Sequence, residues 1–335
     1  MKVTESIHLK SVPTPISRIG LGTWAVGGKE WGGTEEGDAI ATIQYAVDQG
    51  ITLVDTAPAY GLGRSEEIVG KALAADGRRD RAVIATKVAL QRVGDRVYRN
   101  STPAQIESEI HDSLRRLRTD RIDIYQVHWP DPLVPIEETA AALLKLKEQG
   151  KVLALGVSNY SIQQMDAWRT VAPLDSNQPP YNIFERQIEN DILPYSLRHG
   201  LLVLAYGAIC RGLLSGKIKP DQVFTGDDLR RNDPKFQPPR RAQYLAAVDR
   251  LSKLAQERHG RSLLAFAIRW VLDRGDTVVA LWGARRADQL QSAEDAIGWK
   301  LTAEDYAEVD RILAETIHDP VGPEFMAPPV REQKG

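Results

Sequence analysis

Four residues, Asp55, Tyr60, Lys87 and His128, carry side chains that together could act on a carbonyl group. A tyrosine phenol, with an ordinary pKa of about 10, is too weak an acid to donate a proton efficiently at neutral pH. A neighbouring ammonium group stabilises the phenolate and lowers that pKa, so we expect Lys87 to make Tyr60 a general acid. A buried lysine needs a counter-charge, which Asp55 can supply.

His128 extends this chemistry, because an imidazole can hydrogen-bond a substrate carbonyl oxygen and orient it. The four side chains can therefore polarise and protonate a carbonyl group. They contain no source of hydride, so reduction would need an organic cofactor. The residues thus predict a reductase that binds a small carbonyl compound and a hydride-carrying cofactor.

Other interpretations of the same residues remain open. Asp55 could cap a helix, Tyr60 could fill a turn, and His128 could be an ordinary core residue. A lysine in a barrel can also form a Schiff base, so Lys87 could serve an aldolase. A carboxylate partner argues against the aldolase, because it would keep Lys87 charged.

The secondary-structure pattern supplies elements that could position these side chains. Strands are predicted at residues 16–22, 51–55, 82–88, 122–128, 152–158, 174–178, 201–206 and 277–281. Helices are predicted between them at 34–49, with Thr34 as its cap, and at 65–73, 102–117, 136–149, 161–171, 190–199 and 262–274. Eight strands alternating with helices indicate an α/β fold, a (β/α)8 TIM barrel formed by residues 1–335 as a single domain.

Several predicted segments lie outside this repeat. A β-hairpin is expected within residues 6–19, a long loop at 207–241 and an extra helix at 242–259, after the seventh strand. Terminal helices are expected at 287–293 and 302–315, followed by an irregular tail.

Polar residues end most of the predicted strands. Active sites of TIM barrels lie at the carboxyl ends of the strands, so these side chains should converge. They include Asp55, Lys87 and His128 and also Ser158, Asn159, Gln178 and Tyr206, while Arg285 and Arg286 follow the eighth strand.

The bulk composition excludes several classes of protein. The formal net charge is −2 with both signs interspersed, and Cys210 is the single cysteine. We therefore expect no nucleic-acid partner, no disulfide framework and no metal site. No apolar run approaches the ~18 residues that cross a bilayer, and no signal peptide is recognisable, which predicts a cytoplasmic protein without membrane contact. No oligomeric state is predicted.

Six motifs resemble those of the aldo-keto reductase superfamily over residues 6–315. They are Gly20-Leu-Gly-Thr-Trp24, Asp55-Thr-Ala-Pro-Ala-Tyr-Gly61, Ala85-Thr-Lys87, Gln126-Val-His128, Gly156-Val-Ser-Asn159 and Gly283-Ala-Arg285. The resemblance implies NAD(P)H-dependent reduction of aldehydes or ketones. It also implies a catalytic tetrad of Asp55, Tyr60, Lys87 and His128, the same four residues.

The resemblance further implies where a cofactor would bind. Ser158, Asn159 and Gln178 would hold the nicotinamide carboxamide, and Tyr206 would stack on the ring. Residues 211–217 would cover the pyrophosphate, with Arg211, Leu213, Ser215 and Lys217 in contact. Arg285 and Gln289 would reach the adenosine end, and the remaining implied cofactor residues are Gly22, Thr23, Trp24, Asp55, Gly207, Ala208 and Gly283.

The cofactor and substrate are less closely specified. Arg285 and Arg286 favour NADPH over NADH, because guanidinium groups bind phosphate bidentately. Trp24, Tyr60, His128 and Trp129 are expected to line the substrate pocket; Trp31, Tyr98 and Phe325-Met326 are further candidates. Some members of the superfamily are cofactor-sensing subunits of ion channels, so a binding protein with little turnover is the alternative.

Overall fold

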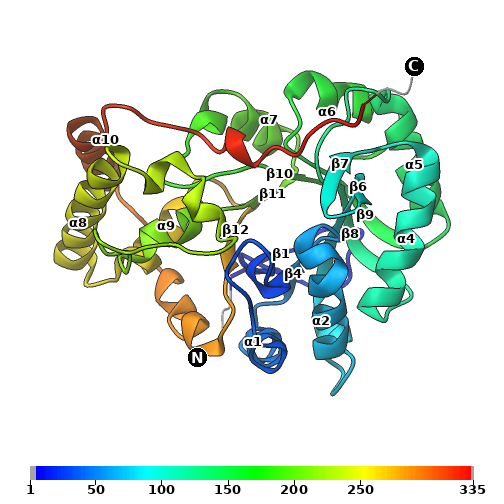
Figure 1. Ribbon diagram of the computed structural model, residues 1–335, viewed down its shortest axis with the longest axis horizontal. Coiled ribbons are helices and arrows are strands. Elements are labelled where there is room, and N and C mark those ends of the chain that lie inside the picture. Colours follow the sequence, from blue (N-terminus) through cyan, green and yellow to red (C-terminus); the bar gives the residue numbers. More distant parts are fainter. Residues whose placement is uncertain (1–4, 333–335) are drawn as a thin grey trace.

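Eight parallel strands close into a barrel in the computed structural model, which describes residues 5–332 (Figure 1). The order around the barrel is β10-β11-β12-β3-β4-β5-β8-β9, which confirms the predicted TIM barrel. The strands are β3 (Ile19–Gly22), β4 (Leu53–Asp55), β5 (Val83–Val88), β8 (Ile122–Val127), β9 (Val152–Ser158), β10 (Ser176–Gln178), β11 (Leu202–Ala205) and β12 (Val278–Gly283). They are buried on both faces, because side chains fill the barrel and helices cover its outside.

Helices surround this barrel. They are α1 (Glu36–Asp48), α2 (Arg64–Leu73), α3 (Arg78–Arg81), α4 (Pro103–Leu117), α5 (Ile136–Glu148), α6 (Ile162–Arg169), α7 (Ile192–Arg198), α8 (Arg240–His259), α9 (Leu263–Leu272) and α10 (Ala303–Thr316). Pro103 occupies the first turn of α4, and the Thr102 hydroxyl caps it. The predicted Thr34 cap is wrong: α1 begins at Glu36, and the Thr34 hydroxyl donates instead to the Ala25 carbonyl oxygen at 2.7 Å. No helix within residues 5–332 has the length and apolar character needed to span a bilayer.

The predicted first strand, 16–22, is two strands in the structure. β2 (Ile16–Ser17) pairs antiparallel with β1 (Ser6–Ile7) in the expected hairpin, whereas β3 joins the barrel. Arg18 separates them. Its backbone N–H donates to Glu5, and its guanidinium donates to the Gly275 carbonyl oxygen at 2.7 Å, so this residue links the hairpin to the end of the barrel.

Further regions differ from the sequence-based prediction, including the helix α3, which was not predicted. A hairpin of β6 (Leu90–Val93) and β7 (Arg96–Arg99) follows β5 and was not predicted. The helix expected at 287–293 is instead two short 3-10 helices, η7 (Ala287–Leu290) and η8 (Ala293–Ala296). The long loop contains three more: η4 (Cys210–Ser215), η5 (Leu229–Arg231) and η6 (Pro234–Phe236).

The C-terminal tail crosses from α10 to the opposite side of the barrel, as the red segment of Figure 1 shows. Near its start, the His318 backbone N–H donates to Gln243 of α8 at 2.9 Å. At its far end, Val330 forms a parallel bridge with Arg99 of β7, and the Arg99 side chain donates to the Pro328 carbonyl oxygen at 2.9 Å. The tail is therefore attached on both sides of the barrel.

Candidate active site

Asp55 and Lys87 form a buried ion pair at the carboxyl ends of two neighbouring strands. Asp55 of β4 lies opposite Ala85 of β5, so Lys87, two residues further along, lies on the same face beyond the end of β4. The Lys87 Nζ donates to both Asp55 carboxylate oxygens, at 2.9 and 2.8 Å, and to the Thr56 carbonyl oxygen at 3.0 Å. All three donor positions of the ammonium are thus used, in a site where Lys87 is 1% exposed.

Tyr60 follows β4 in a loop that a close backbone contact fixes. Gly61 has a φ of 60°, and a Cβ atom there would lie 2.3 Å from the Gly27 carbonyl oxygen, so only glycine fits. The ring of Trp24 stacks on Tyr60 with centroids 5.9 Å apart. The Lys87 Nζ lies 4.9 Å from the centroid of the Tyr60 ring, and His128 meets that ring edge-on at 5.7 Å. The structure therefore brings all four predicted catalytic side chains together.

Burial and charged neighbours set the protonation state of Tyr60. Burial raises the pKa of Tyr60 well above its ordinary value, and the negative charges of Asp55 and Glu30 raise it further. In the free protein the pKa of Tyr60 is thus raised overall, because burial and the two negative charges oppose ionisation. The phenol consequently stays in its proton-donating form. A lowering of this pKa by Lys87 stays a prediction.

His128 is neutral for a related reason. Burial lowers its pKa well below the ordinary value, and the positive charge of Lys87 lowers it further. Burial also lowers the pKa of Lys87, but Asp55 opposes this effect by charge and by hydrogen bonding. The site therefore combines a neutral imidazole, a neutral phenol and an ion pair.

Amide and hydroxyl groups at the ends of β9, β10 and β11 are hydrogen-bonded to the ion pair and to one another. The Gln178 side-chain N–H donates to Asp55 at 2.8 Å, and the Gln178 backbone carbonyl oxygen accepts from the Ser158 hydroxyl at 2.7 Å. The Asn159 amide donates to the His128 carbonyl oxygen at 3.0 Å, while its oxygen accepts from the Tyr206 hydroxyl at 2.9 Å. The predicted nicotinamide-binding residues and the catalytic residues therefore form one hydrogen-bonded surface.

A cavity of about 480 Å³ opens over this surface. The predicted residues that line it are Gly22, Trp24, Asp55, Tyr60, His128, Trp129, Ser158, Asn159, Gln178, Tyr206, Gly207, Arg211, Gly283, Arg285 and Gln289. The residues that do not line it are Thr23, Lys87, Ala208, Leu213, Ser215 and Lys217, so a contact from these to a cofactor stays a prediction. Another hollow, of about 500 Å³, lies at residues 169–174 and includes no predicted site residue.

Several lining residues come from segments whose position only the fold reveals. Trp31, Phe325 and Met326, which the sequence left open, line the cavity, whereas Tyr98 does not. Sequence reasoning missed Glu30, Leu90, Val97, Ile209, Arg230 and Asn232. Val97 belongs to the unpredicted β6–β7 hairpin. The sequence placed Arg230 in the long loop at 207–241, but it did not indicate that this loop reaches the cavity.

Arg285 and Arg286 differ in their surroundings. The Arg285 guanidinium lines the cavity and donates to the carbonyl oxygens of Trp31 at 2.7 Å and Gly33 at 3.0 Å. Arg286 lies outside the cavity lining and pairs with Asp288 at 3.0 Å. Gln289 accepts hydrogen bonds from both backbone N–H groups, so it shapes the turn between them.

Two neighbouring glycines leave room for a ligand between β3 and β12. Gly22 and Gly283 are register partners and both line the cavity. A Cβ atom at Gly22 would meet no protein atom closer than 3.8 Å, and one at Gly283 none closer than 3.9 Å. This cradle lines the same cavity as the amide and hydroxyl groups of Ser158, Asn159 and Gln178, so the cavity has room and polar groups for a nicotinamide.

Comparison with known proteins identifies the family. The sequence profile of the aldo/keto reductase family matches residues 18–314. This chain belongs to the aldo-keto reductase family. It is 56% identical over 317 residues to the aldo-keto reductase YhdN of Bacillus subtilis, covering 95% of this chain and 96% of that protein. Its fold superposes on the glycerol dehydrogenase of Gluconobacter oxydans with a TM-score of 0.88 and 53% identity, covering 96% and 99% of the two chains.

More distant aldo-keto reductases bind different nicotinamide cofactors. The NADH-specific methylglyoxal reductase of Escherichia coli is 36% identical over 330 residues, covering 93% of this chain and 99% of that protein. An aldo/keto reductase of Klebsiella pneumoniae, solved in complex with NADP and acetate, is 28% identical, with a TM-score of 0.71 and coverage of 93% and 96%. The protein is therefore an oxidoreductase that acts on aldehydes or ketones with a nicotinamide cofactor.

Proposed function

We propose that this aldo-keto reductase uses NADPH to reduce small aldehydes or ketones, with Tyr60 as the proton donor. The position of Tyr60 supports this proposal best. Its ring lies 4.9 Å from a buried ammonium and 5.7 Å from the His128 ring, at a cavity that the amide groups of β9 and β10 also line.

Each side chain has a role in this proposal. A nicotinamide held in this cavity would be the source of hydride for the carbonyl carbon. His128 orients the carbonyl oxygen by hydrogen bonding, and Tyr60 donates its proton to that oxygen as the alcohol forms. Lys87 then stabilises the phenolate that remains, and Asp55 keeps Lys87 charged. A Schiff base at Lys87 is disfavoured, because its nitrogen already makes three hydrogen bonds as an ammonium.

We further propose that Ser158, Asn159 and Gln178 hold the nicotinamide carboxamide and that Tyr206 packs on its ring. Their shared hydrogen-bond network and the glycine cradle in the same cavity support this arrangement. Contacts from Thr23, Ala208, Leu213, Ser215 and Lys217 belong to the same proposal. The chain, residues 1–335, would act as a single domain in the cytoplasm.

The preference for NADPH rests on Arg285 and Arg230. Both line the cavity. Burial lowers the pKa of Arg285, and the nearby positive charge of Arg230 lowers it further, whereas Asp228, which pairs with Arg230 at 2.6 Å, opposes this effect. An anion bound beside Arg285 would gain a charge-assisted contact with its guanidinium. The 2′-phosphate of NADPH would be such an anion, whereas NADH lacks it.

The assay for this function follows consumption of NADPH and NADH with a panel of small, dicarbonyl and aromatic aldehydes. We expect turnover with at least one carbonyl compound and a higher kcat/KM with NADPH. Tight binding of NADPH without turnover on any compound would instead favour a cofactor-sensing protein. Faster turnover with NADH would overturn the cofactor preference alone.

A further inference from the structure

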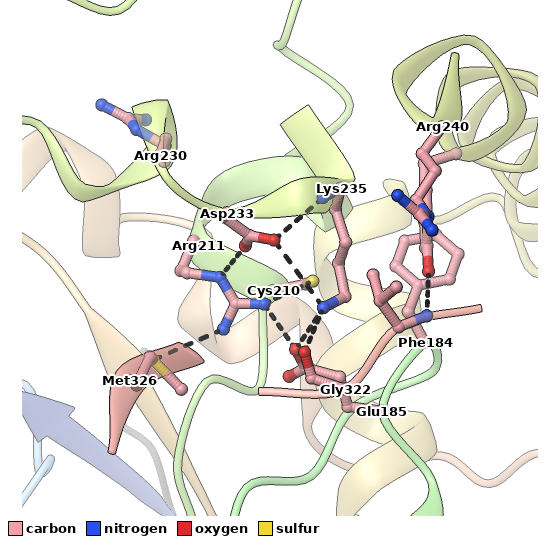
Figure 2. Close-up of polar contacts among 12 residues, drawn as sticks. Phe184, Glu185, Cys210, Arg211, Arg230, Asp233, Lys235, Arg240, Gly322 and Met326 are labelled. Carbon is pink, nitrogen blue, oxygen red and sulfur yellow. Dashed lines mark hydrogen bonds and ion pairs between the residues drawn. The ribbon is translucent and has the colours of Figure 1, made fainter. Parts of the chain in front are cut away.

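Four charged side chains lie buried together beside the loop that follows β11 (Figure 2). They are Glu185, Arg211, Asp233 and Lys235, hereafter the buried ion cluster. Their side chains are 0–3% exposed, although they come from three separate stretches: after β10, within η4, and at the start of η6. Two of the four are cations and two are anions, so the cluster is formally neutral.

Direct contacts join all four members. The Arg211 guanidinium contacts Glu185 at 2.5 Å and Asp233 at 2.5 Å. The Lys235 ammonium contacts Glu185 at 2.8 Å. Burial would raise the pKa of Glu185, but Arg211 and Lys235 outweigh this effect and lower it. The carboxylate is therefore ionised, and each buried charge has an opposite charge beside it.

Stability alone gives a weak reason for this arrangement. Removing a charge from water costs several kcal/mol per ion, and apolar residues of similar volume are often equally stabilising. The cluster also holds a strained backbone. Cys210 and Arg211 have φ values of 45° and 53°, a left-handed conformation that is unfavourable for residues with a Cβ atom. The Arg211 side chain is fixed by ion pairs at this strained turn.

One side of the cluster supports the cofactor-facing surface. Gly207, Arg211 and Gly212 line the cavity. Asn182 donates to the Glu185 carboxylate at 2.7 Å and to the Gly207 carbonyl oxygen at 3.0 Å. The position of Gly207 is thus tied to Glu185 through one side chain.

Another side of the cluster holds the C-terminal tail. The Lys235 ammonium donates to the Gly322 carbonyl oxygen at 3.1 Å. The Arg211 guanidinium lies 5.5 Å from the centroid of the Phe325 ring and 4.0 Å from the Met326 Sδ, and Figure 2 shows Met326 beside it. Phe325 and Met326 line the same cavity as Gly207.

We propose that Glu185, Asp233 and Lys235 are positioning residues, which hold the η4 loop and the tail in fixed relation to each other. In this arrangement, one buried ion cluster sets both the surface that faces the cofactor and the wall formed by Phe325 and Met326. This inference rests on the proposed function. Weakening the cluster should therefore weaken binding of cofactor and of carbonyl substrate together, while the catalytic residues of β4 and β5 remain in place.

The test compares Lys235→Met with Lys71→Met, the same change at a half-buried surface ion pair with Glu36. NADPH affinity is measured by quenching of tryptophan fluorescence, and kcat and KM by turnover. For Lys235→Met, we expect the NADPH Kd and the substrate KM each to rise about tenfold with kcat changed less than about threefold, the signature of lost binding rather than lost chemistry. Lys235→Arg should bring the NADPH Kd and the substrate KM back toward the wild-type values. Lys71→Met should match the wild type in both quantities.

A second measurement is independent of turnover. Backbone hydrogen exchange should become faster at residues 207–216 and 321–327 in Lys235→Met and unchanged there in Lys71→Met. Asp233→Asn, which keeps the shape of the side chain, is the variant to use if Lys235→Met does not fold. A lower melting temperature with unchanged Kd, KM and local exchange would overturn the inference. Absence of turnover in the wild type would refute the proposed function instead. The hydrogen-exchange and Kd measurements would then decide whether the buried ion cluster positions the η4 loop and the tail.

Discussion

Lys87 donates to both carboxylate oxygens of Asp55, at 2.9 and 2.8 Å, and so joins the ends of β4 and β5 beneath Tyr60. Gln178 adds a hydrogen bond to the same carboxylate at 2.8 Å. Asp55 is therefore the point where the predicted catalytic and cofactor-binding residues meet. Its charge keeps Lys87 ionised, but it also raises the pKa of Tyr60.

Tyr60→Phe should remove the proton donor without disturbing the cavity. General acid catalysis typically contributes about 10²–10⁴-fold to the rate, so we expect kcat to fall by about that factor. The NADPH Kd should stay within about twofold, because the ring still packs on Trp24. Tyr45→Phe, on α1 and outside the cavity, is the control. A variant as fast as the wild type would show that another group donates the proton.

Asp55→Asn should move the alkaline limit of activity to lower pH. The acid must be protonated, so activity falls as the pH rises through the pKa of Tyr60. Asp55 raises that pKa, and its loss lowers it. The same change lowers the pKa of Lys87, which loses its charge partner and hydrogen bonds. We expect kcat to fall at least about tenfold, because Lys87 would lose the partner that keeps it charged and would stabilise the phenolate less as the proton leaves Tyr60.

A pH profile of kcat/KM for wild type and Asp55→Asn, from about pH 6 to 11, checks this prediction, because the pKa of Tyr60 in the wild type lies above its ordinary value of about 10. Asp48→Asn serves as the control, because Asp48 pairs with Arg78 at the surface. An alkaline limit at unchanged or higher pH would contradict the assigned coupling between Asp55 and Tyr60.

Glu109→Gln should stabilise the protein at alkaline pH. Burial raises the pKa of Glu109 to about 8, while the unfolded chain ionises near its ordinary value of 4.5. Between these values only the folded state holds the proton, so stability falls as the pH rises from 4.5 toward 8. Glutamine keeps an acceptor for the Ala89 N–H, which Glu109 now binds at 3.2 Å. The melting temperature of the variant should exceed that of wild type by several degrees at about pH 8.5 and match it at about pH 5.

Glu148→Gln, at the exposed end of α5, provides the control for this comparison. If the melting temperatures of Glu109→Gln and wild type differ equally at both pH values, the difference does not arise from the proton on Glu109.

Arg285→Ala should weaken NADPH binding selectively. The 2′-phosphate distinguishes the two cofactors, and a lost charge-assisted hydrogen bond is worth roughly 1.5–3 kcal/mol. We therefore expect the NADPH Kd to rise about tenfold or more and the NADH Kd to change little, in a fluorescence titration. Arg286→Ala is the matched control, because Arg286 pairs with Asp288 outside the cavity. Equal losses for both cofactors would show that Arg285 contacts no 2′-phosphate.

The sequence alone was sufficient for the order of barrel strands and helices. Apolar runs such as Val83–Val88, which are covered on both faces, keep the same pattern wherever they pack. Sequence signals for the ends of helices and strands failed where a tertiary contact competed with the local hydrogen bond. Thr34 has the chemistry of a cap, yet its hydroxyl donates to Ala25 instead. Arg18 divides the predicted strand 16–22, because its guanidinium donates to the carbonyl oxygens of Gly275 and Val278.

The candidate site shows the same division. The sequence by itself determined which side chains end the strands, so Asp55, Lys87, His128 and Gln178 could be grouped from their spacing. Only the tertiary structure decided that Arg230, Phe325 and Met326 share their cavity and that burial keeps Tyr60 protonated. The physical reason is that strand periodicity is local, whereas burial and charge coupling depend on residues that are distant in the chain and adjacent in space.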